Sequence, residues 1–236
     1  MYKVLITTSG TGSRLKELTR NTNKALIPLA GQPIIDSIIA SYKPDVELVF
    51  TLGYCGDQVR EYVSKKYPDR PISFLKVDPY EGEGSSLGYS MLQAKDLLQC
   101  PFIFHCNDTI VRGALPSPEL SNWDAVSRGN DPQIFNAESY SSVLIKDGNI
   151  SEMQMKGAAR FDSFHIGLVG IKDFAVFWQA LEYLYQENPK DTTLNDCAAI
   201  RVMLEKGCVF QPVSITEWYD TGNLVTLQNA RERLKT

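Results

Sequence analysis

The sequence has few of the residues on which the commoner catalytic and metal-binding sites depend. Its 236 residues include 2 histidines, His105 and His165, each inside an apolar run. Such histidines are more often core residues with a satisfied hydrogen bond than ligands. The 5 cysteines are odd in number and have no C-x-x-C spacing. They therefore indicate neither a disulfide framework nor a zinc site, and predict free thiols in a reducing cytosol.

Charge and hydropathy exclude further classes. The net charge of −4 gives no electrostatic basis for binding nucleic acid. No stretch of about 18 apolar residues could cross a membrane, and no basic leader precedes a long apolar segment, so no secretory signal is predicted. Internal repeats, low-complexity segments and linkers are also missing. The chain is therefore expected to form one cytoplasmic domain over residues 1–236, and the sequence leaves a homo-oligomer open.

Two familiar glycine motifs are absent as well. The segment Gly10-Thr11-Gly12-Ser13-Arg14-Leu15 has leucine where a dinucleotide fingerprint needs its third glycine. A Walker loop needs Gly-Lys-Ser/Thr after four intervening residues, and the chain has no such run. A plain structural turn therefore remains an alternative for these two glycines.

Short apolar runs alternate with helical patterns through the first half of the chain. The patterns predict strands at 3–7, 47–52, 72–76 and 102–106, and helices at 33–42, 57–66 and 85–98. This alternation is typical of a parallel sheet with crossover helices.

The second half has a different pattern. It predicts strands at 125–128, 142–146, 149–155, 165–171 and 208–213, and helices at 174–186, 194–206 and 224–234. Asp147-Gly148 lies between two of these strands and is a strong hairpin signal. The predicted fold is therefore a Rossmann-like α/β fold. It has a mixed, mainly parallel sheet flanked by helices and a small antiparallel insertion in the second half.

The loop after the first strand has the chemistry that a triphosphate requires. Gly10 and Gly12 let backbone N–H groups approach a ligand closely. Arg14 supplies a forked cation and Lys24 a point cation. In parallel sheets, ligands bind beyond the carboxyl ends of the strands, which is where this loop is expected.

Two aspartates are candidates for binding a hard cation such as Mg²⁺. Asp108 follows the predicted strand at 102–106, and Asp220 lies in Trp218-Tyr219-Asp220-Thr221-Gly222-Asn223. Mg²⁺ usually takes one or two protein carboxylates and leaves its other positions to phosphates and water. A turn residue for Asp108 and a helix cap for Asp220 are the structural alternatives.

Two further segments are candidates for contacting substrates. Gly84-Ser85-Ser86, at the start of a predicted helix, could lie against a base or ribose, although a loop with a serine cap explains it equally well. Lys156, with Arg160 close by, could bind the phosphate of a second substrate. A solvated surface lysine is the alternative.

Taken together, these motifs resemble the signature of the sugar-nucleotide-type nucleotidyltransferases, or pyrophosphorylases. Gly10 to Leu15, followed by Asn23-Lys24-Ala25-Leu26-Ile27-Pro28, is similar to G-x-G-[ST]-R-L…[PN]-K-x-L-[IV]-P. Asp108, Trp218 to Gly222 and Gly84 to Ser86 stand where that family has comparable segments. Met155-Lys156-Gly157 keeps only the lysine of the family's Glu-Lys-Pro.

The resemblance implies transfer of NMP from an NTP to a phosphorylated acceptor, with release of pyrophosphate. It implies that a nucleotide lies on Thr8, Ser9, Gly10, Thr11, Gly12, Ser13, Arg14, Lys24, Gly84, Ser85 and Ser86. Arg14, Lys24 and Asp108 are the expected catalytic residues, Asp108 and Asp220 the expected Mg²⁺ ligands, and Lys156 and Arg160 the expected acceptor contacts.

The expected partners are an NTP and a small phosphorylated acceptor, with neither nucleic acid nor membrane. The acceptor would be a sugar 1-phosphate or a small phospho-alcohol or phospho-amide used for capsule or surface polysaccharide. Compact, single-domain members of this family often use CTP or GTP, and the resemblance to them favours CTP, with guanylyl or other nucleotidylyl transfer as the alternative. Two alternatives remain open at this stage. One is a non-catalytic module that binds nucleotide sugars, and the other is a glycosyltransferase of similar fold, although the chain lacks an Asp-x-Asp motif.

Overall fold

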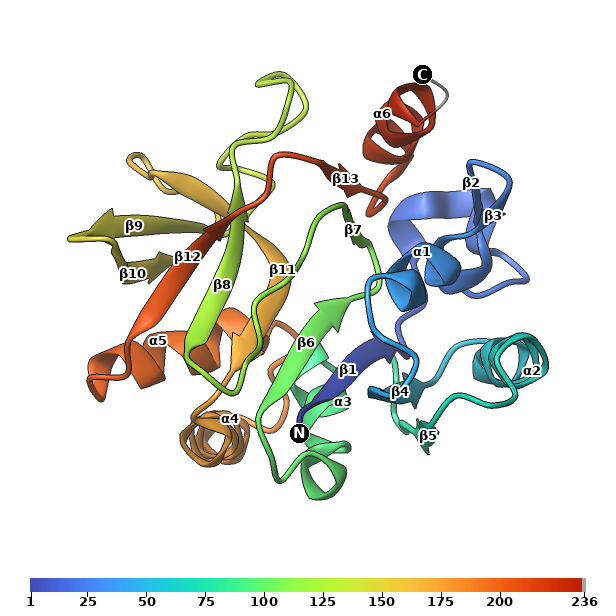
Figure 1. The fold of residues 1–236 in the computed structure, drawn as a ribbon, viewed down its shortest axis with the longest axis horizontal. Coiled ribbons are helices and arrows are strands. Elements are labelled where there is room, and N and C mark those ends of the chain that lie inside the picture. Colours follow the sequence, from blue (N-terminus) through green and yellow to red (C-terminus); the bar gives the residue numbers. More distant parts are fainter. Residues whose placement is uncertain (235–236) are drawn as a thin grey trace.

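The computed structural model describes residues 1–234. Within this range the main sheet has nine strands, and strand β1 lies inside it between β6 and β4 (Figure 1). The strands of the main sheet are β1 (Lys3–Thr8), β4 (Glu47–Leu52), β5 (Ile72–Lys76), β6 (Phe102–Cys106), β8 (Asn122–Ser127), β9 (Ser142–Lys146), β10 (Asn149–Gln154), β11 (Ser163–Ile171) and β12 (Phe210–Ser214).

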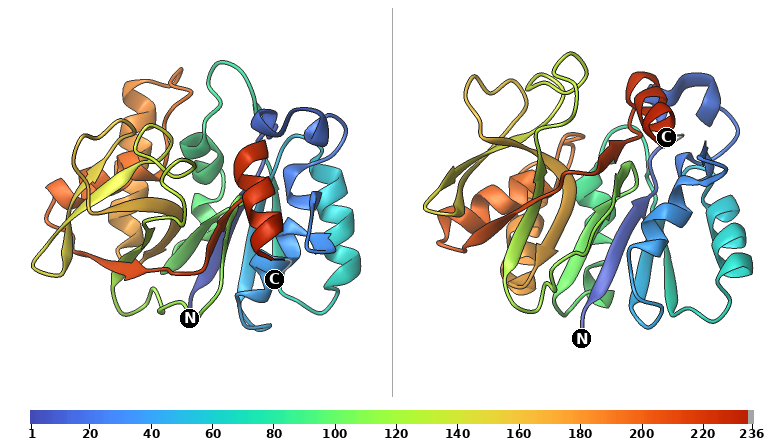
Figure 2. Two further views of the ribbon diagram at one scale, coloured as in Figure 1. Left: turned by 90° about the horizontal axis from the view of Figure 1, so that it is seen from above. Right: turned by 45° about the horizontal axis from the view of Figure 1, so that its top comes forward.

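The first half of the chain forms the parallel part of this sheet. β1 pairs in parallel with β4 on one side and β6 on the other, so that Lys3 lies opposite both Glu47 and Phe102. β5 continues the sheet beyond β4, also in parallel. The carboxyl ends of β1, β4 and β6 therefore meet at one rim. The right panel of Figure 2 shows β1 running from the N-terminus to this rim.

The second half extends the same sheet with largely antiparallel strands. β11 pairs antiparallel with β6, β8 and β9, and β12 pairs in parallel with β8. β9 and β10 form the hairpin that Asp147-Gly148 predicts, with positive φ angles of 50° and 79° at these two residues. The predicted α/β class is confirmed, and the antiparallel strands continue the main sheet.

Helices cover both faces of the sheet, and α4 and α6 lie on opposite sides in Figure 1. Side chains alternate along a strand, so Val4 and Ile6 pack on one face and Leu5 on the other. The helices are α1 (Ile34–Ala40), α2 (Gly56–Lys66) and α6 (Leu224–Arg233) on the first face, and α3 (Leu87–Leu92), α4 (Phe174–Glu187) and α5 (Asp196–Glu205) on the second. Among residues 1–234, none of these helices combines the length and hydrophobicity that a bilayer span needs.

Two small ribbons lie outside the main sheet and were not predicted. β7 (Thr109–Val111) pairs antiparallel with β13 (Trp218–Asp220), and β2 (Pro28–Leu29) pairs with β3 (Gln32–Pro33). The β7–β13 ribbon is the important one for the site. It joins the segment after β6 to a segment near the end of the chain.

The helix predicted at 85–98 is shorter than expected. It begins at Leu87, because the Ser86 side chain caps it by accepting a hydrogen bond from the Tyr89 N–H. It ends at Leu92, and the path continues as a tighter 3₁₀ turn over Lys95–Leu97. Of the two residues between them, Ala94 has φ −92° and ψ −3°, values closer to a turn than to an α-helix.

The histidines and cysteines behave largely as the sequence predicts. His105 is fully buried, with Tyr42 Oη 2.6 Å from its Nδ1 and the Thr109 carbonyl 2.8 Å from its Nε2. His165 is also buried and lies beside Asp124. The five cysteines are free thiols, of which Cys197 is fully buried and the others are half-buried.

Candidate active site

The loop after β1 is held in an open conformation by its own residues. Gly12 has a φ of 65°, and a Cβ there would lie 3.1 Å from the Thr19 side chain and 3.2 Å from that of Lys24. Thr19 donates a hydrogen bond to the Gly12 carbonyl over 3.0 Å. Asn23 is fully buried and donates to the carbonyls of Thr8 (2.8 Å) and Tyr54 (2.6 Å). These contacts fix Lys24 against the carboxyl end of β1.

A cavity of about 470 Å³ opens above this loop. Its wall is made by the segment after β1, the segment before α3 and the end of β6. The residues that line it are Thr7, Thr8, Ser9, Gly10, Thr11, Gly12, Ser13, Arg14, Lys24, Tyr80, Glu81, Gly82, Ser85, Ser86, Leu87, Ser90, Cys106, Asn107, Asp108, Thr192 and Gly222.

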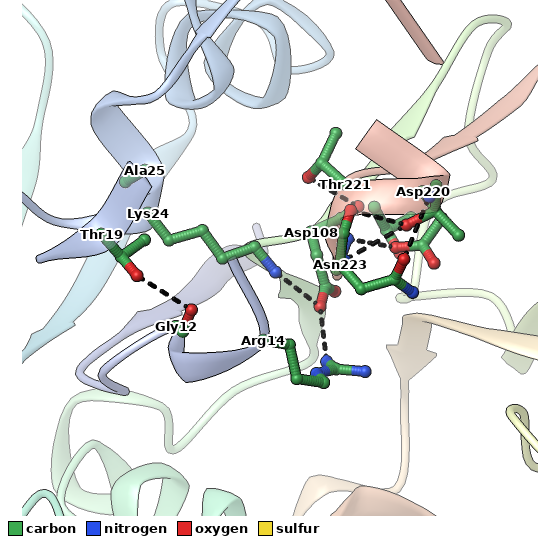
Figure 3. A network of polar contacts seen from close by, with 12 residues as sticks. Gly12, Arg14, Thr19, Lys24, Ala25, Asp108, Asp220, Thr221 and Asn223 are labelled. Carbon is green, nitrogen blue, oxygen red and sulfur yellow. Dashed lines mark hydrogen bonds and ion pairs between the residues drawn. The ribbon is translucent and has the colours of Figure 1, made fainter. Parts of the chain in front are cut away.

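Asp108 lines this cavity and is paired with two cations (Figure 3). Its Oδ2 is 2.7 Å from Lys24 Nζ and 3.5 Å from a terminal nitrogen of Arg14. The Lys24 side chain is 10% exposed, whereas that of Arg14 is 62% exposed and free to follow a ligand. Burial alone would raise the pKa of the Asp108 carboxyl, but Lys24, Cys106 and Arg14 together hold it well below its usual range.

Asp220 reaches the same place from the far end of the chain. The β7–β13 ribbon sets its position, and the Thr221 N–H donates to the Asp108 carbonyl over 2.8 Å. One carboxylate oxygen accepts the Gly222 N–H over 2.6 Å, and the other accepts the Tyr140 hydroxyl. Burial and the nearby Asp108 charge raise the pKa of Asp220 despite these hydrogen bonds.

Gly222 provides a test of whether the two carboxylates could share a cation. A Cβ on Gly222 would lie 2.9 Å from Asp220 Oδ1, 3.2 Å from Asp108 Oδ2 and 3.4 Å from Arg14. Both carboxylates and the guanidinium therefore point at the space that this glycine leaves open. Mg²⁺ prefers oxygen ligands, and its charge would offset the repulsion between the two carboxylates. Asp108 and Asp220 therefore fit that ion.

A second cavity, of about 200 Å³, adjoins the first. Arg14, Leu87, Cys106 and Asp108 line both of them, so the cavities meet at Asp108. The other residues that line the second cavity are Phe104, Thr109, Ser139, Tyr140, Ser141, Lys156, His165, Ile166, Gly167, Asn195, Asp196, Cys197, Trp218 and Asp220.

Comparison with curated proteins gives relatives of one name. The chain is 29% identical over 154 residues to the bifunctional protein GlmU of Methanocaldococcus jannaschii, covering 64% of this chain and 35% of that protein. It is 26% identical over 226 residues to the bifunctional protein GlmU of Methanococcus maripaludis, covering 93% of this chain and 51% of that one. The chain thus spans at most about half the length of these two relatives. No family model matches the sequence.

Solved structures of the same fold cover the whole chain. A putative glucose-1-phosphate thymidylyltransferase from Bacillus anthracis has a TM-score of 0.80 at 19% identity, covering 100% of this chain and 96% of that one. A CTP:phosphocholine cytidylyltransferase from Streptococcus pneumoniae has a TM-score of 0.77 at 16% identity, covering 99% of each chain. A UDP-glucose pyrophosphorylase has a TM-score of 0.78 at 15% identity, covering 100% and 98%.

The chain is thus similar in sequence to the GlmU proteins and shares its fold with solved nucleotidyltransferases, in agreement with the resemblance in the sequence. The structure places most of the residues singled out in the sequence around the two cavities. The nucleotide candidates from Thr8 to Arg14, with Lys24, Ser85 and Ser86, line the first cavity. Asp108 lines both cavities, and Asp220 and Lys156 line the second.

Two candidates lie elsewhere. Gly84 is not among the described residues that line the first cavity; its φ is 84°, and a Cβ there would lie 3.6 Å from the Pro189 carbonyl oxygen. Arg160 is exposed and belongs to the lining of neither cavity within residues 1–234. It lies in the exposed loop between β10 and β11.

One important residue of this site, Tyr140, could not be predicted from the sequence. Tyr140 reaches Asp220 across the second cavity, but it lies in an irregular segment that no motif marks. The role of Thr221 in holding the Asp108 carbonyl was also missed. It could have been suspected from its place in the Asp-Thr-Gly-Asn run.

Proposed function

We propose that residues 1–236 act as one nucleotidyltransferase domain that transfers NMP from an NTP to a sugar 1-phosphate or a similar phosphorylated acceptor. The observation that supports this most directly is the pair of cavities that meet at Asp108. The larger has room for a nucleoside triphosphate and the smaller for the organic part of an acceptor. A displacement in line at the α-phosphorus requires two substrates to meet at one such point.

The proposed roles follow from charge and position. Backbone N–H groups from Gly10 to Ser13 surround the triphosphate, and exposed Arg14 moves onto the β,γ-phosphates and the departing pyrophosphate. Lys24 neutralises the α-phosphate. The acceptor phosphate is already an anionic nucleophile, so no side chain has to remove a proton. This agrees with a site in which both histidines are buried and hydrogen-bonded.

Asp108 and Asp220 would hold Mg²⁺, which stabilises negative charge on the phosphates when it is bound. In the structure, the Lys24 ammonium group compensates the negative charge of Asp108. A phosphate at the loop would compete for Lys24 and leave the Asp108 carboxylate to the cation. Lys24 thereby acts as the group that keeps Asp108 ionised and in place before substrates arrive.

We propose CTP as the nucleotide. Glu81 lines the end of the first cavity nearest the segment before α3, where the base is expected. A carboxylate accepts hydrogen bonds only, so it suits the N4 amino group of cytosine and repels the O4 of uracil or thymine. The likeness to a CTP:phosphocholine cytidylyltransferase is compatible with this choice. The product would serve capsule or surface polysaccharide synthesis from the cytoplasm.

The proposal is tested by pyrophosphate release. Each of the four NTPs is combined with Mg²⁺ and with a panel of acceptors that includes glucose 1-phosphate, inositol 1-phosphate and phosphocholine. The expected result is pyrophosphate release that needs both an NTP and an acceptor and is fastest with CTP. Sugar transfer from a nucleotide sugar without pyrophosphate chemistry, or nucleotide-sugar binding without turnover, would contradict it.

A further inference from the structure

A second group of potential ligands lies at the wall of the smaller cavity and has no part in the proposed reaction. His165 comes from β11, and Asp196 and Cys197 come from the first turn of α5. All three are buried, and their nitrogen, oxygen and sulfur atoms lie within 4.8 Å of one another. His165 Nε2 and Asp196 Oδ2 are the closest pair, 3.1 Å apart.

The hydrogen bonds around His165 fix which of its nitrogens faces this group. Asp124 is fully buried, and its Oδ1 lies 2.8 Å from His165 Nδ1. A carboxylate can only accept, so this contact assigns a hydrogen to Nδ1. Nε2 accepts the Gly167 N–H over 3.2 Å. In this tautomer Nε2 carries the lone pair that accepts the Gly167 N–H, and Asp196 Oδ2 lies 3.1 Å from the same nitrogen.

The opposing oxygen of Asp196 is also short of a partner. Asp196 is 4% exposed, and among the described residues its Oδ2 has no hydrogen-bond donor. A ring nitrogen lone pair and a carboxylate oxygen 3.1 Å apart need a positive charge between them. A proton on Nε2 could supply that charge, and so could a metal ion that also takes Cys197.

We propose that His165, Asp196 and Cys197 bind a divalent transition-metal ion of the zinc class. One nitrogen, one oxygen and one sulfur ligand suit Zn²⁺ and Co²⁺, and disfavour Mg²⁺ and Ca²⁺, which take oxygen ligands. Zinc–ligand bonds of about 2.0–2.1 Å at tetrahedral angles separate nitrogen and oxygen ligands by about 3.3 Å, close to the 3.1 Å observed. The fourth position would face the 200 Å³ cavity, which all three residues line.

Asp124 completes the expected arrangement around such a site. A histidine that binds a metal almost always donates its other ring hydrogen to a carboxylate or carbonyl, which orients the ring. Here the His165 ring is oriented by Asp124 on the neighbouring strand β8. His165 and Asp124 are therefore arranged like a metal ligand and the carboxylate that orients it. The spacing of the cysteines in the sequence predicts no such zinc site.

Local backbone features hold these ligands in place. The register of β11 against β8 shifts between His165 and Val169, and Gly167 within this bulge has a φ of 73°. A Cβ on Gly167 would lie 2.8 Å from Cys106 Cβ, so glycine is required there. On the other side, Asn195 caps α5 by accepting the Ala198 N–H over 3.2 Å. A site on a bulged strand and a capped helix is already formed before a metal arrives.

The test uses the full chain after removal of metal by a chelator, titrated with Co²⁺. The expected result is one Co²⁺ per chain with tetrahedral d–d bands, a thiolate-to-cobalt charge-transfer band and release of protons, and Zn²⁺ should displace the cobalt. Cys197→Ser should abolish the charge-transfer band. Asp124→Asn should weaken binding by about 10–100-fold. Far-UV circular dichroism and melting curves check that each variant is folded.

Two matched controls locate the ion. Cys106→Ser removes the other thiol of the same cavity and should leave the band unchanged. Asp108→Asn disables the proposed Mg²⁺ position and should also leave it unchanged. Absence of stoichiometric cobalt binding, a band that survives Cys197→Ser, or a band lost in Cys106→Ser would each overturn the proposal. Because the readout is spectroscopic, it is independent of whether the chain transfers nucleotides.

Discussion

Lys24 Nζ lies 2.7 Å from Oδ2 of Asp108 at the point where the two cavities meet. Both side chains are largely buried, so the pair is shielded from solvent and each charge depends on the other. The same lysine is fixed by the Asn23 turn that anchors the loop after β1. A structural contact and the cation proposed for the α-phosphate are thus combined in one side chain.

Replacing this lysine should affect both stability and turnover. Lys24→Ala leaves Asp108 without its closest cation and removes the charge proposed for the α-phosphate, so we expect kcat/KM to fall by about 10²–10³-fold. Pyrophosphate release measures the effect. Lys65→Ala on exposed α2 is the control and should behave as wild type. Near-normal turnover by a folded Lys24→Ala protein would contradict the role assigned to it.

Replacement of Asp220 and of Asp108 by neutral asparagine should shift the melting temperature in opposite directions. The folded pKa of Asp220 is raised, so its ionisation costs stability above that pKa and the cost disappears as pH falls. Asp220→Asn should therefore raise the melting temperature at about pH 7.5, by an amount that shrinks toward about pH 4. Activity should be lost at the same time, because a proposed Mg²⁺ ligand is gone.

Asp108 provides the contrasting case. Its folded pKa is lowered, so its stabilising contribution is fully present above its unfolded pKa of about 3.9 and is lost as pH falls further. Asp108→Asn should accordingly lower the melting temperature at about pH 7.5. Equal shifts of the same sign in the two variants would show that the carboxylates do not differ as the structure indicates.

Gly222→Ala should separate metal binding from nucleotide binding. The added methyl would lie 2.9 Å from Asp220 Oδ1, so it should push this carboxylate aside and lower kcat or raise the Mg²⁺ requirement. Gly10→Ala makes a useful comparison, since its Cβ meets nothing within 4 Å in the protein but projects from the nucleotide loop. It should mainly raise KM for the NTP. Unchanged Mg²⁺ dependence in Gly222→Ala would be evidence against a shared cation.

Glu81 should influence the choice of base. Glu81→Gln replaces an obligate acceptor by a side chain that can also donate, so it should reduce discrimination between CTP and UTP by about 10-fold. The measurement is the ratio of kcat/KM values for the two nucleotides. Glu83→Gln, at a neighbouring exposed position outside the cavity lining within residues 1–234, is the matched control. An unchanged ratio in Glu81→Gln would remove the structural argument for CTP.

Local sequence patterns were sufficient for much of the fold. The strands at 47–52, 72–76, 102–106 and 142–146 have the predicted bounds, because each is an apolar run that ends at turn residues. The Asp147-Gly148 hairpin depends only on local backbone preferences. The glycine loop and both aspartates could be singled out for the same reason, since each directly follows a strand or precedes a helix.

Features that depend on distant contacts were not predictable. The β7–β13 ribbon is only three residues long on each side and forms between segments far apart in the chain. The Tyr140 contact with Asp220 and the cluster around His165 arise where separate strands and a helix converge. No local pattern marks such positions, because the packing of the whole sheet creates them.

The place of β13 in the chain has a consequence for biosynthesis. Each strand of the main sheet ends by Ser214, whereas Asp220 and the Thr221 contact with Asp108 come after it. A ribosome that synthesises this chain from its N-terminus therefore adds the last residue of every strand of the sheet before it adds the second carboxylate. The proposed cation site is consequently one of the last features of the protein to be assembled, after most of its supporting framework has been made.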